Sequence, residues 1–115
     1  MMNQWITVCD EDDLHIDAGV CALVGGHQIA LFLCGHNNTL YAINNYDPIG
    51  KANVLSRGII GSLQGTVVVA SPLYKQHFCL ESGQCIESAE MLVPTYPVRR
   101  INGCIQVQLL VSLMR

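Results

Sequence analysis

The sequence predicts an all-β fold, a small antiparallel β-sandwich or barrel with two loops at one end. Short apolar runs alternate with turns marked by Gly, Asn or Pro, which is typical of antiparallel strands. No stretch keeps the apolar period of an amphipathic helix for more than about two turns. Two runs lead into loops at Pro48 and Pro72, which have no N–H for a sheet ladder. We expect one domain over residues 1–115.

Four strands are expected before the first loop. They cover residues 5–9, 20–24, 28–33 and 39–43. Gly25-Gly26-His27 joins the second strand to the third as a hairpin, because glycine adopts positive φ at no steric cost. The acidic run after the first strand, residues 10–14, favours one helical turn because carboxylates stabilise a helix N-terminus.

The two loops lie in the middle of the chain. The first runs from Asn44 to about Val54, and a mixed segment without a predicted strand follows at 55–60. A strand at 66–70 then leads into the second loop, 71–78. Because both loops interrupt the sheet in the same way, we expect a site between them.

The C-terminal third contains the clearest hairpin. Segment 94–97, bounded by two prolines, is expected to be extended and at a sheet edge. The ranges 98–101 and 104–111 pair across Asn102-Gly103, which suits a type I′ turn. The apolar end, 109–115, either continues this strand or docks on another surface.

Composition narrows the classes of function. Charged residues make up 13% of the chain, about half the usual fraction, which favours a surface covered by a protein partner. The alternative is a small domain that is simply apolar. A net charge of −3 with scattered basic residues argues against nucleic acid as a partner.

The same features bear on location. No run approaches the ~20 apolar residues of a spanning helix, and the N-terminus lacks the pattern of a signal peptide, so we expect no membrane and a cytoplasmic protein. The six cysteines lie in or beside apolar strands, and in a reducing compartment they are expected to be thiols.

Several motifs in this order resemble the Rieske-type domains, and most of all the small subunits of NADH-dependent assimilatory nitrite reductase. The resemblance extends from Trp5 to about Val107 and implies a Rieske-like [2Fe-2S] domain fold. The motifs are Leu40-Tyr41-Ala42-Ile43-Asn44-Asn45, Asp47-Pro48, Val54-Leu55-Ser56-Arg57-Gly58, Val68-Val69-Ala70-Ser71-Pro72-Leu73 and Phe78-Cys79-Leu80-Glu81-Ser82-Gly83-Gln84-Cys85.

The resemblance also identifies the positions of the cluster ligands. In Rieske domains one loop supplies Cys-x-His and the other Cys-x2-His; thiolates hold one iron and imidazoles the other. Here the four positions carry Asp47, Ile49, Ser71 and Tyr74, none of which matches. The resemblance therefore implies a chain with no metal site, no cofactor and no catalytic residue of its own.

Two Cys/His pairs elsewhere have ligand-like spacing. Cys34-Gly35-His36 lacks a Cys-x2-His partner downstream, and His77-Phe78-Cys79 offers two groups where a structural metal site needs four. His15 and His27 are expected in turns or at the surface. None of these residues predicts a metal centre.

The resemblance implies a partner, the large subunit of the enzyme. That subunit is expected to hold FAD, an iron–sulfur cluster and sirohaem and to reduce nitrite to ammonium with NADH, as part of nitrate assimilation. This chain would support or regulate it. We expect the docking surface at the loop end of the domain, in Asp47, Pro48, Arg57, Ser71, Pro72, Tyr74, Lys75 and Gln76.

Alternatives remain open at this stage. Arg57 could pair with Asp47 to brace the loops, while Tyr74 fills the space of the cluster. The chain could also be a Rieske-type electron-transfer ferredoxin with atypical ligands, or a free-standing regulatory module that binds a small molecule between the loops.

Overall fold

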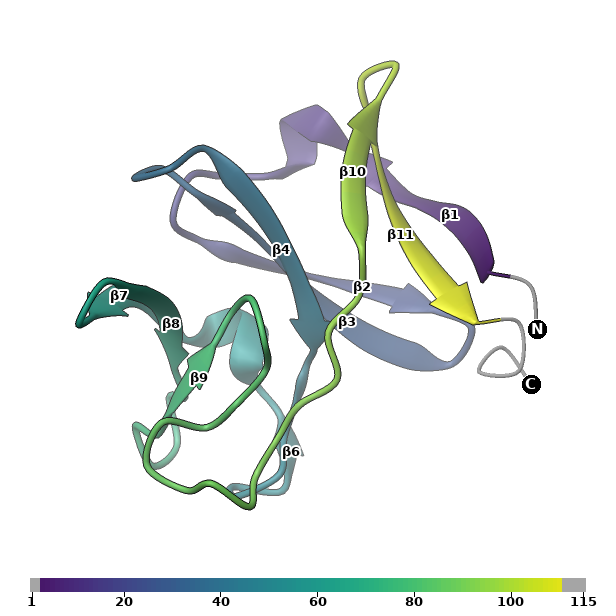
Figure 1. Cartoon of the computed structure of the whole chain (residues 1–115). Coiled ribbons are helices and arrows are strands. Elements are labelled where there is room, and N and C mark those ends of the chain that lie inside the picture. Colours follow the sequence, from purple (N-terminus) through teal and green to yellow (C-terminus); the bar gives the residue numbers. More distant parts are fainter. Residues whose placement is uncertain (1–2, 111–115) are drawn as a thin grey trace.

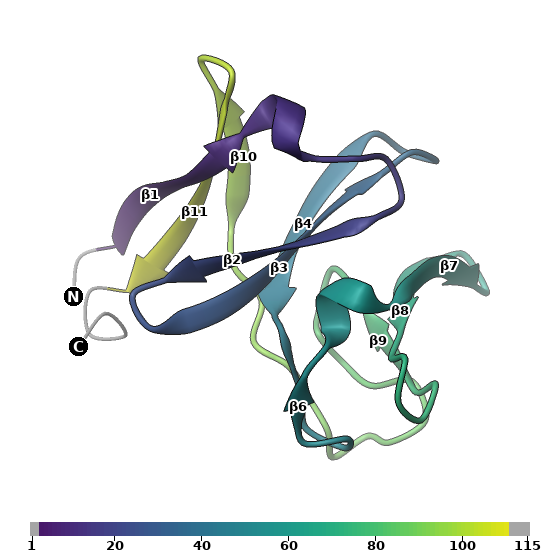
Figure 2. The same ribbon diagram turned by 180° about the vertical axis from the view of Figure 1, so that it is seen from behind.

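The computed structural model describes residues 3–110, and it is built from strands that form two lobes (Figures 1 and 2). One lobe contains two three-stranded sheets, ordered β1-β11-β10 and β2-β3-β4. The other contains the sheet β7-β8-β9 and the short pair β5-β6. The all-β prediction is confirmed, since the helical segments among these residues are two single 3-10 turns.

The first sheet joins the two ends of the described chain. β1 (Asn3–Asp10) pairs antiparallel with β11 (Cys104–Leu110), which also pairs with β10 (Val98–Ile101). Asn102 and Gly103 have φ of 52° and 78°, so the predicted type I′ hairpin turn is confirmed. The apolar C-terminal prediction is confirmed only as far as Leu110, because residues 111–115 lie outside the described range.

The second sheet is a meander of three strands. β2 (Gly19–Val24), β3 (His27–Cys34) and β4 (Thr39–Asn44) pair in sequence order. Positive φ at Gly25 and Gly26 forms the predicted hairpin turn. The acidic turn after β1 is η1 (Glu11–Asp13), where the Asp13 carboxylate accepts the backbone N–H of Asp10 at 3.0 Å.

The third sheet carries the second loop. It consists of β7 (Ile59–Leu63), β8 (Thr66–Ala70) and β9 (His77–Cys79). β7 was not expected, because Gly58 and Gly61 interrupt its apolar pattern; it forms because the turn after Leu63 folds it back onto β8. The first loop contains β5 (Tyr46–Asp47), β6 (Ala52–Asn53) and the turn η2 (Leu55–Arg57).

The chain has two apolar cores. One of them packs Phe32 and Ile43 of the second sheet against Leu55, Val69 and Phe78, all buried, and so lies between the two lobes, beneath the loops. Asn45 connects the lobes: it is buried, its side-chain oxygen accepts Ser56 N–H at 2.7 Å, and its amide donates to Gln28 at 3.1 Å. The loops therefore sit on a packed base.

Two further sequence expectations can be assessed on this structure. All six cysteines are free thiols. Among residues 3–110, none of the helical segments has the length and apolar character that crossing a bilayer requires.

Candidate functional site

The two loops are built on the same local motif. Each begins with a buried polar residue followed by proline, Asp47-Pro48 or Ser71-Pro72. Each closes with a lysine whose N–H donates to the carbonyl four residues earlier: Lys51 to Asp47 at 2.7 Å and Lys75 to Ser71 at 3.0 Å. Both lysines have positive φ, 58° and 63°. Short polar side chains at the first position favour this turn, because they accept N–H groups two residues on.

The first residues of the two loops are bonded to each other. Ser71 Oγ donates to Asp47 Oδ2 at 2.5 Å, and the two residues are 1% and 0% exposed. The other carboxylate oxygen, Asp47 Oδ1, accepts the N–H of Ile49 at 2.8 Å and of Gly50 at 3.0 Å. A buried charge needs such partners, and here the three donors come from both loops. This polar pair fastens one loop to the other.

The loops also touch through Gly50 and Leu73. A Cβ built on Gly50 would lie 2.5 Å from Leu73 Cδ1 and 2.9 Å from Asp47 Oδ2, so a larger residue would have to displace the Leu73 side chain or the Asp47 carboxylate. Leu73 is nevertheless 45% exposed. The Leu73 side chain therefore lies beside Gly50 of the first loop and is also in contact with solvent.

The four positions of the cluster ligands can be tested for their fit to a [2Fe-2S] cluster. Asp47 and Ser71, which the resemblance places at the two thiolate positions, are bonded to each other. Ile49 has no donor atom, and the side chain of Tyr74 is 65% exposed. Thiolate and imidazole are the ligands such a cluster takes. These four residues do not fit the cluster.

The Cys/His pairs do not supply a replacement. Within residues 3–110, no three His, Cys, Asp or Glu side chains are grouped so that they could hold a metal ion. Cys34 is buried at the end of β3 and His36 is exposed in the following turn. His77 Nδ1 instead meets Glu87 Oε2 at 2.6 Å, and His77 N–H donates to Glu87 Oε1 at 2.8 Å.

The His77–Glu87 contact holds segment 86–90 against the exit of the second loop. Burial raises the pKa of Glu87, but the hydrogen bonds from the His77 backbone and ring, together with the charge of the ring, outweigh it and lower the pKa. With the carboxylate 44% exposed, this is a surface contact. The contact joins His77, at the end of the second loop, to the segment that contains Glu87.

The predicted docking residues divide into buried and exposed sets. Asp47 and Ser71 are buried, so their side chains cannot form part of a docking surface, and that part of the prediction is wrong. Pro48 and Gln76 are half-buried. Four residues are exposed at the loop end or beside it: Arg57, Pro72, Tyr74 and Lys75.

Two alternatives for these residues are also wrong. Arg57 does not brace the loops, because the Asp47 oxygens are taken by Ser71, Ile49 and Gly50, and the ion pairs of the described chain do not include Arg57. Tyr74 does not fill the site, because it extends into solvent. The carboxylate–hydroxyl pair does the bracing.

Sequence reasoning missed the exposure of Leu73. Its position between Pro72 and Tyr74 in a loop, away from any alternating pattern, is the signal that could have identified it. We define the loop face as Pro72, Leu73, Tyr74 and Lys75, four consecutive exposed residues.

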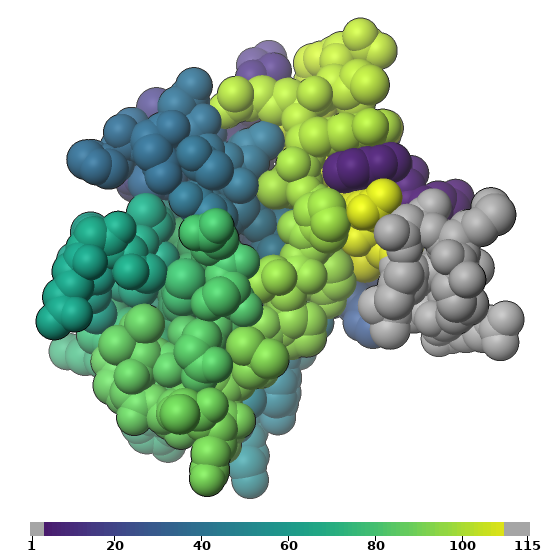
Figure 3. Space-filling model, viewed as in Figure 1, coloured from purple at the N-terminus to yellow at the C-terminus, as the bar shows by residue number. Residues whose placement is uncertain are grey.

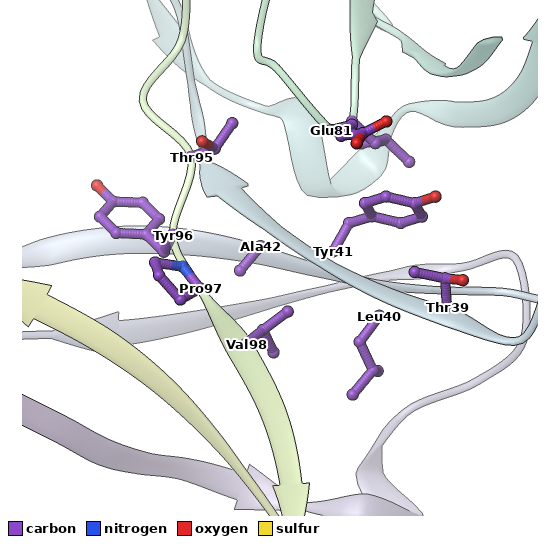
Figure 4. A pocket seen from close by; sticks show the side chains of 10 residues that line it. Thr39, Leu40, Tyr41, Ala42, Glu81, Thr95, Tyr96, Pro97 and Val98 are labelled. Atoms are coloured by element: carbon purple, nitrogen blue, oxygen red, sulfur yellow. The ribbon is translucent and has the colours of Figure 1, made fainter.

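A large hollow lies outside the space between the loops. It is a groove of about 470 Å³ bordered by residues 39–42 of β4, by Leu80 and Glu81, and by segment 95–98 (Figure 4). The geometry does not favour a small-molecule site between the loops, because Leu73 lies against Gly50 there.

Comparison with known proteins gives consistent matches over nearly the whole chain. Residues 4–108 match the Rieske-like [2Fe-2S] domain family. The chain is 45% identical over 107 residues to the nitrite reductase (NADH) small subunit of Salmonella typhimurium, covering 93% of this chain and 99% of that protein. The NMR structure of the E. coli protein NirD is 43% identical, with a TM-score of 0.85, covering 93% of this chain and 97% of that one.

A further match has a different chain organisation. Part of the nitrite reductase [NAD(P)H] large subunit of Klebsiella oxytoca is 42% identical over 103 residues. The match covers 90% of this chain and 11% of that protein. In that relative the corresponding domain is thus one part of a much longer polypeptide.

Proposed function

Because the chain belongs to the family of NADH nitrite reductase small subunits, which is built on a Rieske-like [2Fe-2S] domain, we propose that it binds the large subunit as a non-catalytic component that supports or regulates it. It is a subunit of an oxidoreductase. The observation that carries the proposal is the 45% identity to a small subunit over 99% of that protein's length.

The absence of a redox role is supported by the chemistry of the loops. Where a Rieske domain presents two thiolates, this chain has a carboxylate and a hydroxyl bonded to each other. The redox groups expected from the family, FAD, an iron–sulfur cluster and sirohaem, would then belong to the large subunit. What this chain contributes is a preformed shape at the loop end.

We assign the contact with the large subunit to the loop face, together with Arg57. The tip of this face is a tyrosine, 65% exposed, preceded by a half-exposed leucine and followed by a lysine. Tyrosine and arginine are the residue types that dominate interface energies when they become central and desolvated. The Asp47–Ser71 pair behind them fixes the loops before binding, which lowers the entropy lost on association.

The relative from Klebsiella oxytoca supports a stoichiometric association. There a homologous domain belongs to the same polypeptide as the large subunit, which is a permanent one-to-one arrangement. A cytoplasmic complex agrees with the six free thiols, since a reducing compartment keeps such cysteines unpaired.

The test is a titration of purified large subunit with this chain, read out as binding and as NADH-dependent reduction of nitrite. The Tyr74→Ala variant is expected to raise Kd by about 30-fold, the equivalent of ~2 kcal/mol for a central tyrosine. Its unfolding free energy should stay within ~0.5 kcal/mol of the parent, because the side chain is mostly exposed.

The matched control is Leu23→Ala. Leu23 is 75% exposed on β2, in the other lobe, and its truncation should leave Kd unchanged. The proposal of a subunit is wrong if the parent chain does not bind the large subunit. The assignment to the loop face is wrong if Tyr74→Ala and Leu23→Ala behave alike.

A further inference from the structure

The sheet β7-β8-β9 has one face on the core and one face towards solvent. Residues in register across a sheet share a face, and residues next to them along each strand lie on the opposite one. The row that faces the core consists of Ile60, Val69, Phe78 and Cys85. The neighbouring row, on the outer face, consists of Ile59, Ala70, His77 and Ile86.

The outer face exposes apolar side chains. Ile59 is 77% exposed and Ile86 is 48% exposed, at the two ends of the row, and Leu63 lies on the same face of β7. The residues named on this face include no lysine, arginine, aspartate or glutamate. Single exposed apolar residues are common on proteins, but an uncharged group of them marks an interaction site.

The part of this face that β7 borders is hollowed. The hollow, of about 140 Å³, is lined by residues 59–63 and by Val68, Ala70 and His77. Gly61 leaves room for it, since a Cβ built there would meet nothing within 4 Å. An apolar cavity of ~150 Å³ holds one benzene ring, so this hollow has the size of one large apolar side chain. We call it the β7 hollow.

The outer face adjoins the loop face. Ala70 and His77 are the strand residues on either side of the second loop. Ile59 follows Arg57 and Gly58 in the chain, and Gly58 lies against the carbonyl of Ala70. In Figures 1 and 3 the teal β7 forms the margin of the molecule, next to the green segment that carries the second loop. The loop face, Arg57 and the outer face therefore make one continuous surface.

The loop face is too small to be a whole interface. A stable complex buries ~800 Å² on each partner, from about 20–30 residues, whereas the loop face and Arg57 together are five residues. The contact has to extend onto a neighbouring surface. Interface cores are depleted of charge, which favours the outer face over the first loop, where Lys51 is exposed.

We propose that the large subunit extends its contact from the loop face onto the outer face and places one large apolar side chain in the β7 hollow, between Ile59 and His77. The inference rests on the proposed function, because the large subunit is the partner it names. Ile59 and Ile86 become buried in the complex. The contact between His77 and Glu87 lies at the polar rim of this surface.

The β7 hollow is tested by filling it with a side chain of this protein. Gly61 is not among the glycines with positive φ, so valine can replace it, and its side chain would occupy the hollow. Gly61→Val should not lower the unfolding free energy, because valine suits a strand, and it should raise Kd for the large subunit at least about tenfold. The matched control is Ser62→Val, an exposed neighbour on the other face of β7, which should keep Kd within about twofold.

The apolar contact is tested with Ile59→Thr. Its control is Leu23→Thr, because Leu23 is 75% exposed on β2 and Ile59 is 77% exposed on β7. Threonine suits a strand at both positions. Ile59→Thr should raise Kd for the large subunit about tenfold, since it removes apolar surface that the complex buries. Leu23→Thr should keep Kd within about twofold, and equal affinities of the two variants would overturn the contact at Ile59.

The outcomes separate the two proposals. If Tyr74→Ala weakens binding while Gly61→Val and Ile59→Thr bind like their controls, the contact at the outer face is wrong and the proposed function stands. If the parent chain does not bind the large subunit, both are wrong. If the free chain sediments as a dimer that Gly61→Val dissociates, the occupant of the β7 hollow is a second copy, and its assignment to the large subunit is overturned.

Discussion

Replacing Ser71 with alanine removes the bond between the two loops, together with the weaker bond that Ser71 Oγ accepts from Leu73 N–H at 3.3 Å. Ser71 Oγ is one of three donors to the buried Asp47 carboxylate, and it is the one that acts on Oδ2. A hydrogen bond to a charged group contributes about 1.5–3 kcal/mol, and an oxygen left without its donor at 0% exposure cannot turn to water. We therefore expect the unfolding free energy to fall by about 2 kcal/mol.

The assay is urea unfolding followed by the fluorescence of Trp5, the single tryptophan. Since the slope for a small domain is about 1–3 kcal/mol per molar urea, the midpoint should fall by roughly 1 M with the slope unchanged. The matched control is Ser62→Ala, an exposed serine in β7, which should change the free energy by less than ~0.5 kcal/mol.

This reasoning is refuted if Ser71→Ala lowers the unfolding free energy by no more than Ser62→Ala does. The loops would then be held by packing of Leu73 over Gly50, and the polar pair would be incidental. A double-mutant cycle with Asp47→Asn checks the same point: the two changes should be strongly non-additive, because they remove the same contact.

Two other predictions concern a surface pair and a glycine. The lowered pKa of Glu87, ordinarily 4.5, means that its contact with His77 stabilises the fold above that pH, and the contribution is lost as pH falls through the lowered pKa. The parent protein should therefore lose more unfolding free energy between pH 7 and pH 3 than the Glu87→Gln variant. The difference should be less than about 1 kcal/mol, because the carboxylate is 44% exposed. Equal pH dependence of the unfolding free energy in both proteins would contradict this. Gly83 and Gly65 have φ of 81° and 82°, but a Cβ at Gly83 collides with Val93 O while one at Gly65 meets nothing within 4 Å. Gly65→Ala should cost about 1 kcal/mol of unfolding free energy and Gly83→Ala about 2 kcal/mol more, and equal costs would show that the contact with Val93 relaxes freely.

Local chemistry explains the part of the fold that could be predicted. The turns at Gly25-Gly26 and Asn102-Gly103 have the positive φ angles that their residues favour, and the strands around them follow. β7 could not be predicted in this way. Its residues have a weak strand pattern, and the strand exists because β8 supplies its hydrogen-bond partners.

The candidate site was predictable in place but not in detail. Proline after Asp47 and Ser71 marked the two loops, and the resemblance related their residues to cluster ligands. That Asp47 and Ser71 are buried against each other, and that Tyr74 is exposed, depends on how two segments 24 residues apart approach one another. No local preference encodes that approach.

The sequence by itself determined an all-β chain, the two proline-marked loops, the relationship to the nitrite reductase small subunits and the residue types that do not match cluster ligands. These properties depend on the type of each residue and on its neighbours in the sequence. Only the tertiary structure decided which loop residues are buried and which are exposed. The reason is that burial and backbone pairing arise from contacts between distant segments, and the free energy of each contact depends on what else packs there.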